Sequence, residues 1–179
     1  MNARSQAVDD AAPPASAFET VFEAHYERTA RLIARLVKDP ARAEELAVEV
    51  FWKLWRNPQA HGDNVGGWLY RTAVRAGLYE LRRQSRRLKM AHLLSPGTAS
   101  STPEDLHAAH QTQEHVRRAL AALPPRQAEL LLLRSQDLTY AELASALHLN
   151  PASVGTLLSR AQQNFRKAYQ KLYGPQTIR

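Results

Sequence analysis

The chain has no cysteine among its 179 residues. It can therefore form neither disulfides nor cysteine-ligated zinc sites, and this composition is typical of proteins from a reducing compartment. No apolar run approaches the roughly 20 residues that a transmembrane helix requires, and the N-terminal residues lack the apolar centre of a signal peptide. We therefore expect no membrane insertion and a cytoplasmic location.

The usual signatures of strands and of catalysis are also missing. No segment alternates apolar and polar residues over the length of a strand, and no internal repeat is present. The sequence has no glycine-rich phosphate loop and no nucleophile–base constellation. One histidine-rich helix face leaves a metal-dependent hydrolase as the weakest alternative, and a solvated polar face is favoured there. That face contains His107, His110, Glu114 and His115. We expect no enzymatic activity, no cofactor and no metal.

The charge that is present is positive and unevenly distributed. The net charge is +7, and residues 18–90 hold 14 Lys and Arg against 9 Asp and Glu. Residues 113–179 hold 9 against 4, and the stretch between these two segments carries only Glu104 and Asp105. A basic balance indicates a polyanionic partner. The pattern predicts two basic domains on either side of a slightly acidic connector.

Apolar residues recur at helical spacing through the first basic segment. They predict a first helix from Phe18 to about Val37 and a third from Gly67 to Leu88. Between these, Asp39 is a suitable N-cap with Pro40 at the first helical position, and the second helix should end at Asn57 because Pro58 follows. The glycines and polar residues of 59–66 predict a loop.

The second half of the chain is also predicted to be helical. Residues 93–101 have the Ser, Pro, Gly and Thr content of a linker, and Thr102 begins a capping box for a helix over Glu104–Leu123. Pro124 and Pro125 break this helix, and another follows over Arg126–Ser135. Residues 1–17 and 174–179 are predicted to be flexible tails. The expected fold class is therefore all-α, with two small helical domains joined by a flexible linker.

A unit near the C-terminus has the signals of a helix-turn-helix. Thr139 and Glu142 have the spacing of a capping box, and the turn follows at His148. Asn150 is a good N-cap for the next helix, and Pro151 suits its first position. The second helix of such a unit enters the DNA major groove. Any helical hairpin with good caps has the same pattern, so the motif alone leaves a simple hairpin open.

The second helix of this unit has one apolar face and one polar face. Spacings of three and four residues place these apolar residues together: Val154, Leu157, Leu158, Ala161, Phe165, Ala168 and Leu172. The candidate DNA-binding residues are Ala152, Ser153, Thr156, Ser159, Arg160 and Gln163. Arg160 can pair bidentately with guanine, while Ser, Thr and Gln can bind base edges or phosphates. An ordinary solvated helix face is the alternative.

Two features of the first half also suggest partner contacts. Arg82, Arg83, Arg86, Arg87 and Lys89 place five cations within eight residues, which on a helix facing DNA would form a phosphate-binding track and otherwise a solvated surface. Trp52 lies off the apolar face of its helix, which fits either a partner contact or partial burial. Trp68 fits core packing better than stacking on an unpaired base.

Taken together, the two halves resemble the bacterial extracytoplasmic-function (ECF, group IV) sigma factors, which are small two-domain subunits of RNA polymerase. In the first half the resemblance rests on Arg42–Arg56 (RAEELAVEVFWKLWR) and on Trp68–Arg71 leading to Leu81-Arg82-Arg83. In the second half it rests on Ala119–Arg126 (ALAALPPR), Leu130–Arg134 and Thr139–Ala144 (TYAELA). The resemblance spans about residues 18–172.

The resemblance implies a function and a set of partners. Residues 18–90 would be sigma domain 2, which binds the beta-prime clamp helices of core polymerase and melts the promoter −10 element. Residues 91–103 would be the linker. Residues 104–173 would be sigma domain 4, which places its helix-turn-helix on the −35 element and binds the beta flap. The regulon would answer to stress or another signal, and an anti-sigma factor is a further partner compatible with the family.

The resemblance also implies site residues. Those for core polymerase binding are Glu45, Val48, Glu49, Trp52 and Arg56. Those for the −10 element and its phosphates are Asn64, Trp68, Arg71, Arg75, Arg82, Arg83, Arg86 and Arg87.

The chain departs from the family pattern at several positions. The usual Asp-Leu-Val-Gln-Glu reads Glu45-Leu46-Ala47-Val48-Glu49, and the usual Asn and Asp of the third helix fall at Arg75 and Tyr79. Gly155 and Leu157 stand where the recognition helix usually carries Lys and Arg, so Arg160 is the strongest base-reading group that remains. A stand-alone helix-turn-helix regulator is the alternative function, although the acidic and apolar second helix argues against it.

Overall fold

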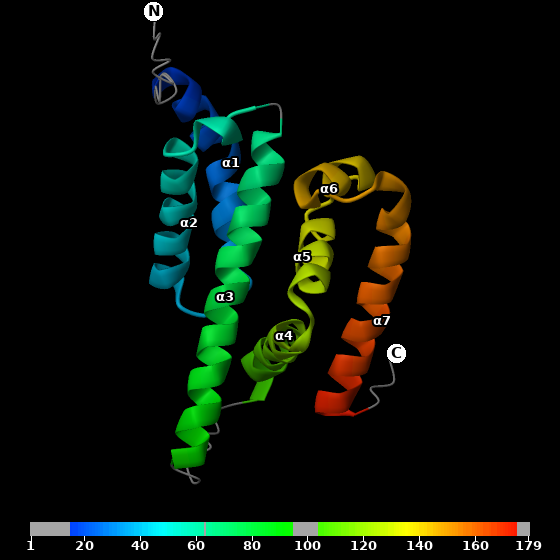
Figure 1. The fold of residues 1–179 in the computed structure, drawn as a ribbon. Helices are drawn as coiled ribbons and strands as arrows, with labels where there is room; N and C mark the ends of the chain where they lie inside the picture. Colours follow the sequence, from blue (N-terminus) through cyan, green and yellow to red (C-terminus); the bar gives the residue numbers. More distant parts are fainter. Residues whose placement is uncertain (1–14, 63, 95–103, 175–179) are drawn as a thin grey trace, which may run out of the picture.

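The computed structural model describes residues 15–62, 64–94 and 104–174. Over these ranges the chain forms seven α-helices and two 3-10 turns, and none of these residues is in a strand. In chain order the elements are α1 (Ala15–Ala34), α2 (Pro40–Trp55), η1 (Pro58–Ala60), α3 (Val65–Leu94), α4 (Glu104–Ala122), α5 (Pro125–Arg134), α6 (Tyr140–Leu147), η2 (Pro151–Ser153) and α7 (Val154–Tyr173). The predicted all-α fold class is confirmed (Figure 1).

Parts of the predicted tails and linker lie outside the described residues. These are residues 1–14, 95–103 and 175–179. The helices next to them extend further than the sequence predicts, since α1 begins at Ala15 and α3 continues to Leu94. The extension of α3 has a local reason, because no glycine or proline follows Gly77 until Pro96.

Helices α1, α2 and α3 pack as a three-helix bundle, which we call the N-terminal bundle. Asp39 caps α2 as predicted, and its carboxylate accepts hydrogen bonds from the backbone N–H groups of Ala41 at 3.0 Å and Arg42 at 3.4 Å. The core of the bundle is apolar and includes Leu32, Ile33, Val50, Leu54, Leu69 and Val74. Trp55 lies at the edge of this core, where its ring meets that of Phe18 edge-on at 5.0 Å.

Helices α4 to α7 form the second group, which we call the C-terminal bundle. Pro124 and Pro125 separate α4 from α5 as predicted, and α7 packs on both of these helices. Val154, Leu158 and Ala161 are buried on the inner face of α7. The apolar spacing predicts that Leu172 is buried on this face as well, and this is wrong, because Leu172 is 48% exposed in the last turn of the helix.

The two bundles pack against each other through α3. This helix contacts α1 and α2 on one side and α4, α5 and α6 on the other, as Figure 1 shows. The buried apolar residues of both bundles form a single continuous cluster. The long third helix is therefore the element that positions one bundle relative to the other.

Candidate polymerase and DNA interfaces

The outer face of α2 presents large apolar side chains to solvent. Val48 and Trp52 lie one turn apart and are 56% and 59% exposed. Glu45 and Glu49 lie beside them, also one turn apart, with exposed carboxylates. Arg56 is exposed at the C-terminal end of the same helix. An exposed Trp next to an acidic pair is typical of a protein-binding surface rather than of a solvated helix.

Arg42 orients the acidic pair of this surface. Its Nη1 donates to Glu45 at 2.8 Å and to Glu49 at 3.2 Å, while its Nε lies 3.6 Å from the buried Glu80 of α3. The hydrogen bond to Glu45 is the largest of the interactions that together raise the pKa of Arg42 above its usual value. The guanidinium therefore links the acidic pair on α2 to the neighbouring helix.

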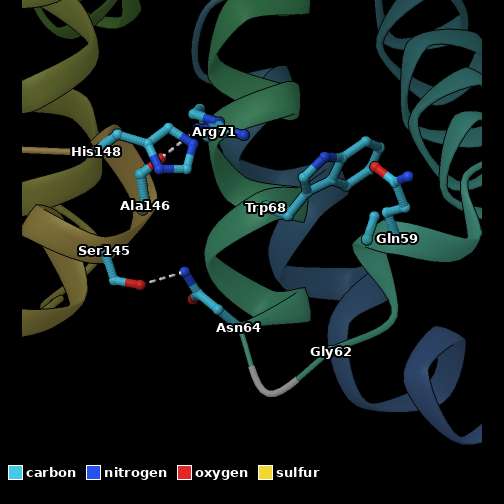
Figure 2. Close-up of a pocket in the computed structure, with 9 residues that line it drawn as sticks. Gln59, Gly62, Asn64, Trp68, Arg71, Ser145, Ala146 and His148 are labelled. Carbon is cyan, nitrogen blue, oxygen red and sulfur yellow. Dashed lines mark hydrogen bonds between the residues drawn. The ribbon is translucent and has the colours of Figure 1, made fainter.

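The basic side of α3 faces the C-terminal bundle. Arg71 donates to the backbone oxygen of Ala146 at 2.8 Å, and the Asn64 amide donates to the Ser145 hydroxyl at 2.7 Å. Burial, followed by the nearby charge of Arg75, lowers the pKa of Arg71. These two contacts close one side of a cavity of about 330 Å³ that also contacts Gln59, Trp68 and His148. Figure 2 shows the two hydrogen bonds that reach α6, one from Asn64 just before α3 and one from Arg71 within it.

Arg75 and Glu129 form a bidentate ion pair between α3 and α5. Arg75 donates from Nε at 3.0 Å and from Nη2 at 3.3 Å to the two carboxylate oxygens. The Glu129 side chain is only 7% exposed, whereas that of Arg75 is 55% exposed. A buried carboxylate needs a partner of this kind, because an unpaired buried charge is strongly destabilising.

The basic run at the C-terminal half of α3 divides into two parts. Arg82 donates to the backbone oxygens of Ala121 at 3.4 Å and Leu123 at 3.1 Å, and Arg83 pairs with the buried Glu80 at 3.0 Å. Arg86 and Arg87 are exposed one turn further on. Arg82 is therefore engaged with the end of α4, whereas Arg83, whose side chain is 45% exposed, reaches solvent together with Arg86 and Arg87.

The helix-turn-helix is built by the local signals that the sequence contains. Thr139 and Glu142 form the predicted capping box, with the Glu142 carboxylate accepting from the Thr139 N–H at 2.7 Å. This backbone hydrogen bond is the main reason that the pKa of Glu142 is lowered. His148 ends α6 in the left-handed region with φ of 52°, and the Asn150 side chain accepts from Ala152 N–H at 3.0 Å. The first turn after Asn150 is the 3-10 turn η2 rather than α-helix.

The recognition helix α7 and the η2 turn before it expose most of the predicted DNA-binding residues. Those in solvent are Ala152, Thr156, Ser159, Arg160 and Gln163. Ser153 differs, because it is half-buried and its hydroxyl donates to the Asn150 backbone oxygen at 2.8 Å. The Ser153 hydroxyl hydrogen is therefore already donated within the turn and is not free to donate to DNA. A second cavity of about 220 Å³ lies between α3, α5, α6 and α7 and contacts Arg75 and Arg160.

Comparison with known proteins identifies both bundles. Residues 21–87 match the family described as Sigma-70 region 2, and residues 113–163 match the family described as Sigma-70, region 4. The ECF RNA polymerase sigma factor SigK of Mycolicibacterium vanbaalenii is 29% identical over 161 residues, covering 85% of this chain and 80% of that protein. The corresponding SigE of Mycolicibacterium smegmatis is 27% identical over 164 residues, covering 88% of this chain and 63% of that protein.

The chain belongs to the ECF sigma factors. It is a promoter-recognising subunit of bacterial RNA polymerase, and its partners are core polymerase and promoter DNA. The match of residues 21–87 to region 2 disfavours a stand-alone helix-turn-helix regulator. The fold agrees, since the sigma factor RpoE in its co-crystal structure with the anti-sigma factor NepR from Bartonella quintana has a TM-score of 0.52 at 17% identity. That match covers 86% of this chain and 96% of the other.

Several residues of this sigma factor position the candidate surfaces through ion pairs that the sequence did not predict. Arg42, Glu80 and Glu129 are the clearest cases. The available signal for Glu129 was its position among apolar residues, because it shares the inner face of α5 with Leu132 and Leu133. A carboxylate on such a face indicates a cationic partner from another helix.

On the histidine-rich face of α4, the described side chains of Glu114 and His115 contact other residues of the chain. Glu114 pairs with Lys38 at 2.9 Å and with Arg118 at 3.0 Å, and the His115 ring stacks on Tyr173 at 3.6 Å. The side chains of His107 and His110 lie outside the described residues. Among the residues described, the His, Asp and Glu side chains form no group that could hold a metal ion. Of the helices described in this sigma factor, none combines the length and apolar character that a membrane crossing requires.

Proposed function

We propose that this sigma factor binds core polymerase through α2 and promoter DNA through α3 and α7. Residues 18–90 then act as sigma domain 2 and residues 104–173 as sigma domain 4. Sigma factors are non-enzymatic initiation factors, and we propose that this chain likewise has no catalytic activity and acts in the cytoplasm. The match to RpoE, whose co-crystal structure includes an anti-sigma factor, supports an anti-sigma factor as a further partner.

The observation that carries the polymerase-binding role is the exposed face of α2. Val48 and Trp52 stay in solvent, although the apolar residues on the opposite face of the helix are buried. Glu45 and Glu49 give the surface a negative edge. A partner with an apolar groove and a basic rim would be complementary to it. We assign this partner as the beta-prime clamp helices, and Arg56 extends the contact at the end of α2.

The DNA-binding role rests on the cations of α3 and the polar face of α7. Asn64, Trp68, Arg71 and Arg75 would contact the −10 element, and Arg82, Arg83, Arg86 and Arg87 its phosphates. The residues assigned to the −35 element are Ala152, Ser153, Thr156, Ser159, Arg160 and Gln163. Arg160 is the strongest of these because guanidinium reads guanine bidentately.

Charge reversal at Glu49 tests the polymerase-binding surface. Glu49→Lys should weaken binding to core polymerase at least about tenfold, because it places a like charge against the basic rim of the partner. Glu27→Lys on α1 makes the same charge change at an exposed position away from α2 and should bind as the parent does. The measurement is competition with labelled parent chain for core polymerase. Equal competition by Glu49→Lys and the parent would exclude α2 as the binding surface.

A further inference from the structure

Four leucines give the cavity beside α5 and α7 an apolar lining. The cavity has a volume of about 220 Å³, and the leucines that contact it are Leu130, Leu147, Leu149 and Leu157. An apolar protein cavity of about 150 Å³ is large enough to bind benzene. The cavity of this chain therefore has room for one aromatic ring and a short chain attached to it.

Two of these leucines keep surface that the fold does not bury. Leu149 follows α6 and Leu157 lies on α7, and both are half-buried although they pack against the apolar core. An apolar group in the cavity would remove this surface from water, which is favourable in proportion to the area covered. The lining thus favours a ligand with an apolar body.

Three arginines contact the same cavity, and two of them have no anionic partner. Arg75 is engaged by Glu129 in the bidentate pair described above, so these two charges offset each other. Arg126 and Arg160 are exposed, and among the described residues neither forms an ion pair or a hydrogen bond. Two guanidinium groups beside the leucines are therefore available to an anion.

The start of α5 adds to the positive potential at this place. Its first turn borders the cavity through Pro124, Arg126 and Gln127. Pro124 is the N-cap and has no side-chain acceptor, and the first turn contains no Asp or Glu. The N-terminus of a helix carries partial positive charge and favours an anion nearby. The helix end and the two arginines thus favour a ligand of the same charge.

We propose that this cavity is a binding site for a small monocarboxylate with an apolar body, of the arylalkanoic acid class. The carboxylate accepts hydrogen bonds from Arg126 and Arg160, and the ring contacts the leucines. An inorganic anion would leave the leucine surface in water, and a neutral hydrocarbon would leave the arginines unpaired. The site is separate from the α2 surface and is independent of the roles proposed for α3.

Isothermal titration calorimetry of the full chain with 3-phenylpropionate tests the site. The acid should bind, and 3-phenyl-1-propanol should bind at least about 10-fold more weakly, because it has the same ring and chain without the charge. Inorganic phosphate supplies charge without an apolar body and should be weaker by a similar factor. Absence of binding by the acid, or equal binding by either control compound, would overturn the proposal.

A charge-losing variant tests the role of the guanidinium groups. Arg126→Gln should bind 3-phenylpropionate at least about 10-fold more weakly than the parent. Arg126 is exposed and is not among the proposed DNA-binding residues, so the variant should fold, and circular dichroism checks this. Arg166→Gln removes the same charge from an exposed position of α7 outside the cavity and should bind as the parent does. Equal affinities of the two variants for the acid would overturn the proposal.

Backbone amide chemical shifts distinguish this cavity from the larger one. The cavity of about 330 Å³ also combines an aromatic side chain with a cation, Trp68 and Arg71. Titration of the isotope-labelled chain with 3-phenylpropionate should cause its largest shift changes at Gln127, Leu149 and Leu157. Largest changes at Trp68 and its neighbours would place the acid in the other cavity and would overturn the proposal.

Discussion

The side chain of His25 on α1 faces α3 in an environment that disfavours the charged imidazolium. Its Nδ1 is 2.8 Å from the Tyr70 hydroxyl, and its ring also lies close to the backbone at Gly66. Burial, followed by the charge of Arg28, lowers the pKa of His25 from its usual value. The neutral imidazole is therefore the form that the folded chain prefers.

Stability should consequently fall as the pH is lowered through the histidine range. Below about pH 6.5 the unfolded chain takes up a proton that the folded chain resists, so this contribution is complete above that pH and is lost below it. Urea unfolding between pH 8 and pH 5 measures the effect. His25→Gln should have a smaller decrease in unfolding free energy over this range than the parent. Equal decreases in the two chains would show that His25 does not cause it.

Arg160 should determine base preference at the −35 element. A bidentate contact with guanine contributes about 1–3 kcal/mol of discrimination, so Arg160→Ala should relax the preference at one or two positions. Arg166→Ala, also exposed on α7 but on the other flank, should lower affinity without changing preference. Selection from a library randomised at the −35 element measures both. Unchanged preferences at every position in Arg160→Ala would place the specificity elsewhere.

Helix α7 contains a glycine near its start that the fold does not require. A Cβ at Gly155 would lie 3.6 Å from the Tyr140 ring, an ordinary contact, and Gly155 has no unusual φ. Gly155→Ala should therefore raise the unfolding free energy by up to about 1 kcal/mol. Urea denaturation provides the test, and a loss of stability would contradict it. If Gly155→Ala has a higher unfolding free energy but binds promoter DNA more weakly, the glycine is needed for close approach of the α7 backbone to DNA.

The exposed end of the basic run on α3 should bind phosphates. Arg86→Gln with Arg87→Gln should lower affinity for all duplex sequences and flatten the slope of log affinity against log salt by about 1.8, since each phosphate contact contributes about 0.9. A control that replaces Arg31 and Lys53, exposed on α1 and α2, removes the same charge. Its slope should stay near that of the parent. The prediction fails if the two double variants have the same slope.

Helix starts were predictable because their causes are local. The caps formed by Asp39, Thr139 and Asn150 involve side chains two or three residues from the N–H groups that they bind, so spacing alone identifies them. The end of α3 was less predictable. The helix continues from the predicted end at Leu88 to Leu94, because the residues between them are compatible with a helix. The burial expected for Leu172 was wrong because its neighbour Tyr173 faces α4, where its ring stacks on His115, while Leu172 is exposed.

At the scale of the whole molecule, the sequence predicted two bundles but not their contact. The Arg75–Glu129 pair joins residues 54 positions apart, and Arg71 reaches a backbone oxygen 75 positions away. No periodicity or spacing encodes such pairs, and a backbone oxygen has no sequence signal at all. The candidate residues on α2 and α7 were found as exposed faces, whereas several of those on α3 were found in use between the bundles.

The arrangement divides the molecule into an open and a covered surface. On α2, Val48 and Trp52 are exposed to a protein partner. The C-terminal bundle packs along one side of α3 (Figure 1). A chain with a net charge of +7 would otherwise bind nucleic acid without selection. In the structure, the guanidinium groups of Arg71, Arg75 and Arg82 are instead engaged within the protein.

Promoter-selective transcription in vitro tests the central claim most directly. Core RNA polymerase, genomic fragments from the source organism and the full chain should together produce transcripts with defined start sites that core polymerase alone does not make. Glu49→Lys, added at the same concentration, should reduce these transcripts, and Glu27→Lys should not. Defined starts that require the chain and decline in Glu49→Lys are the result that we predict. Transcription that is unchanged by adding the chain would contradict its assignment as a promoter-recognising subunit.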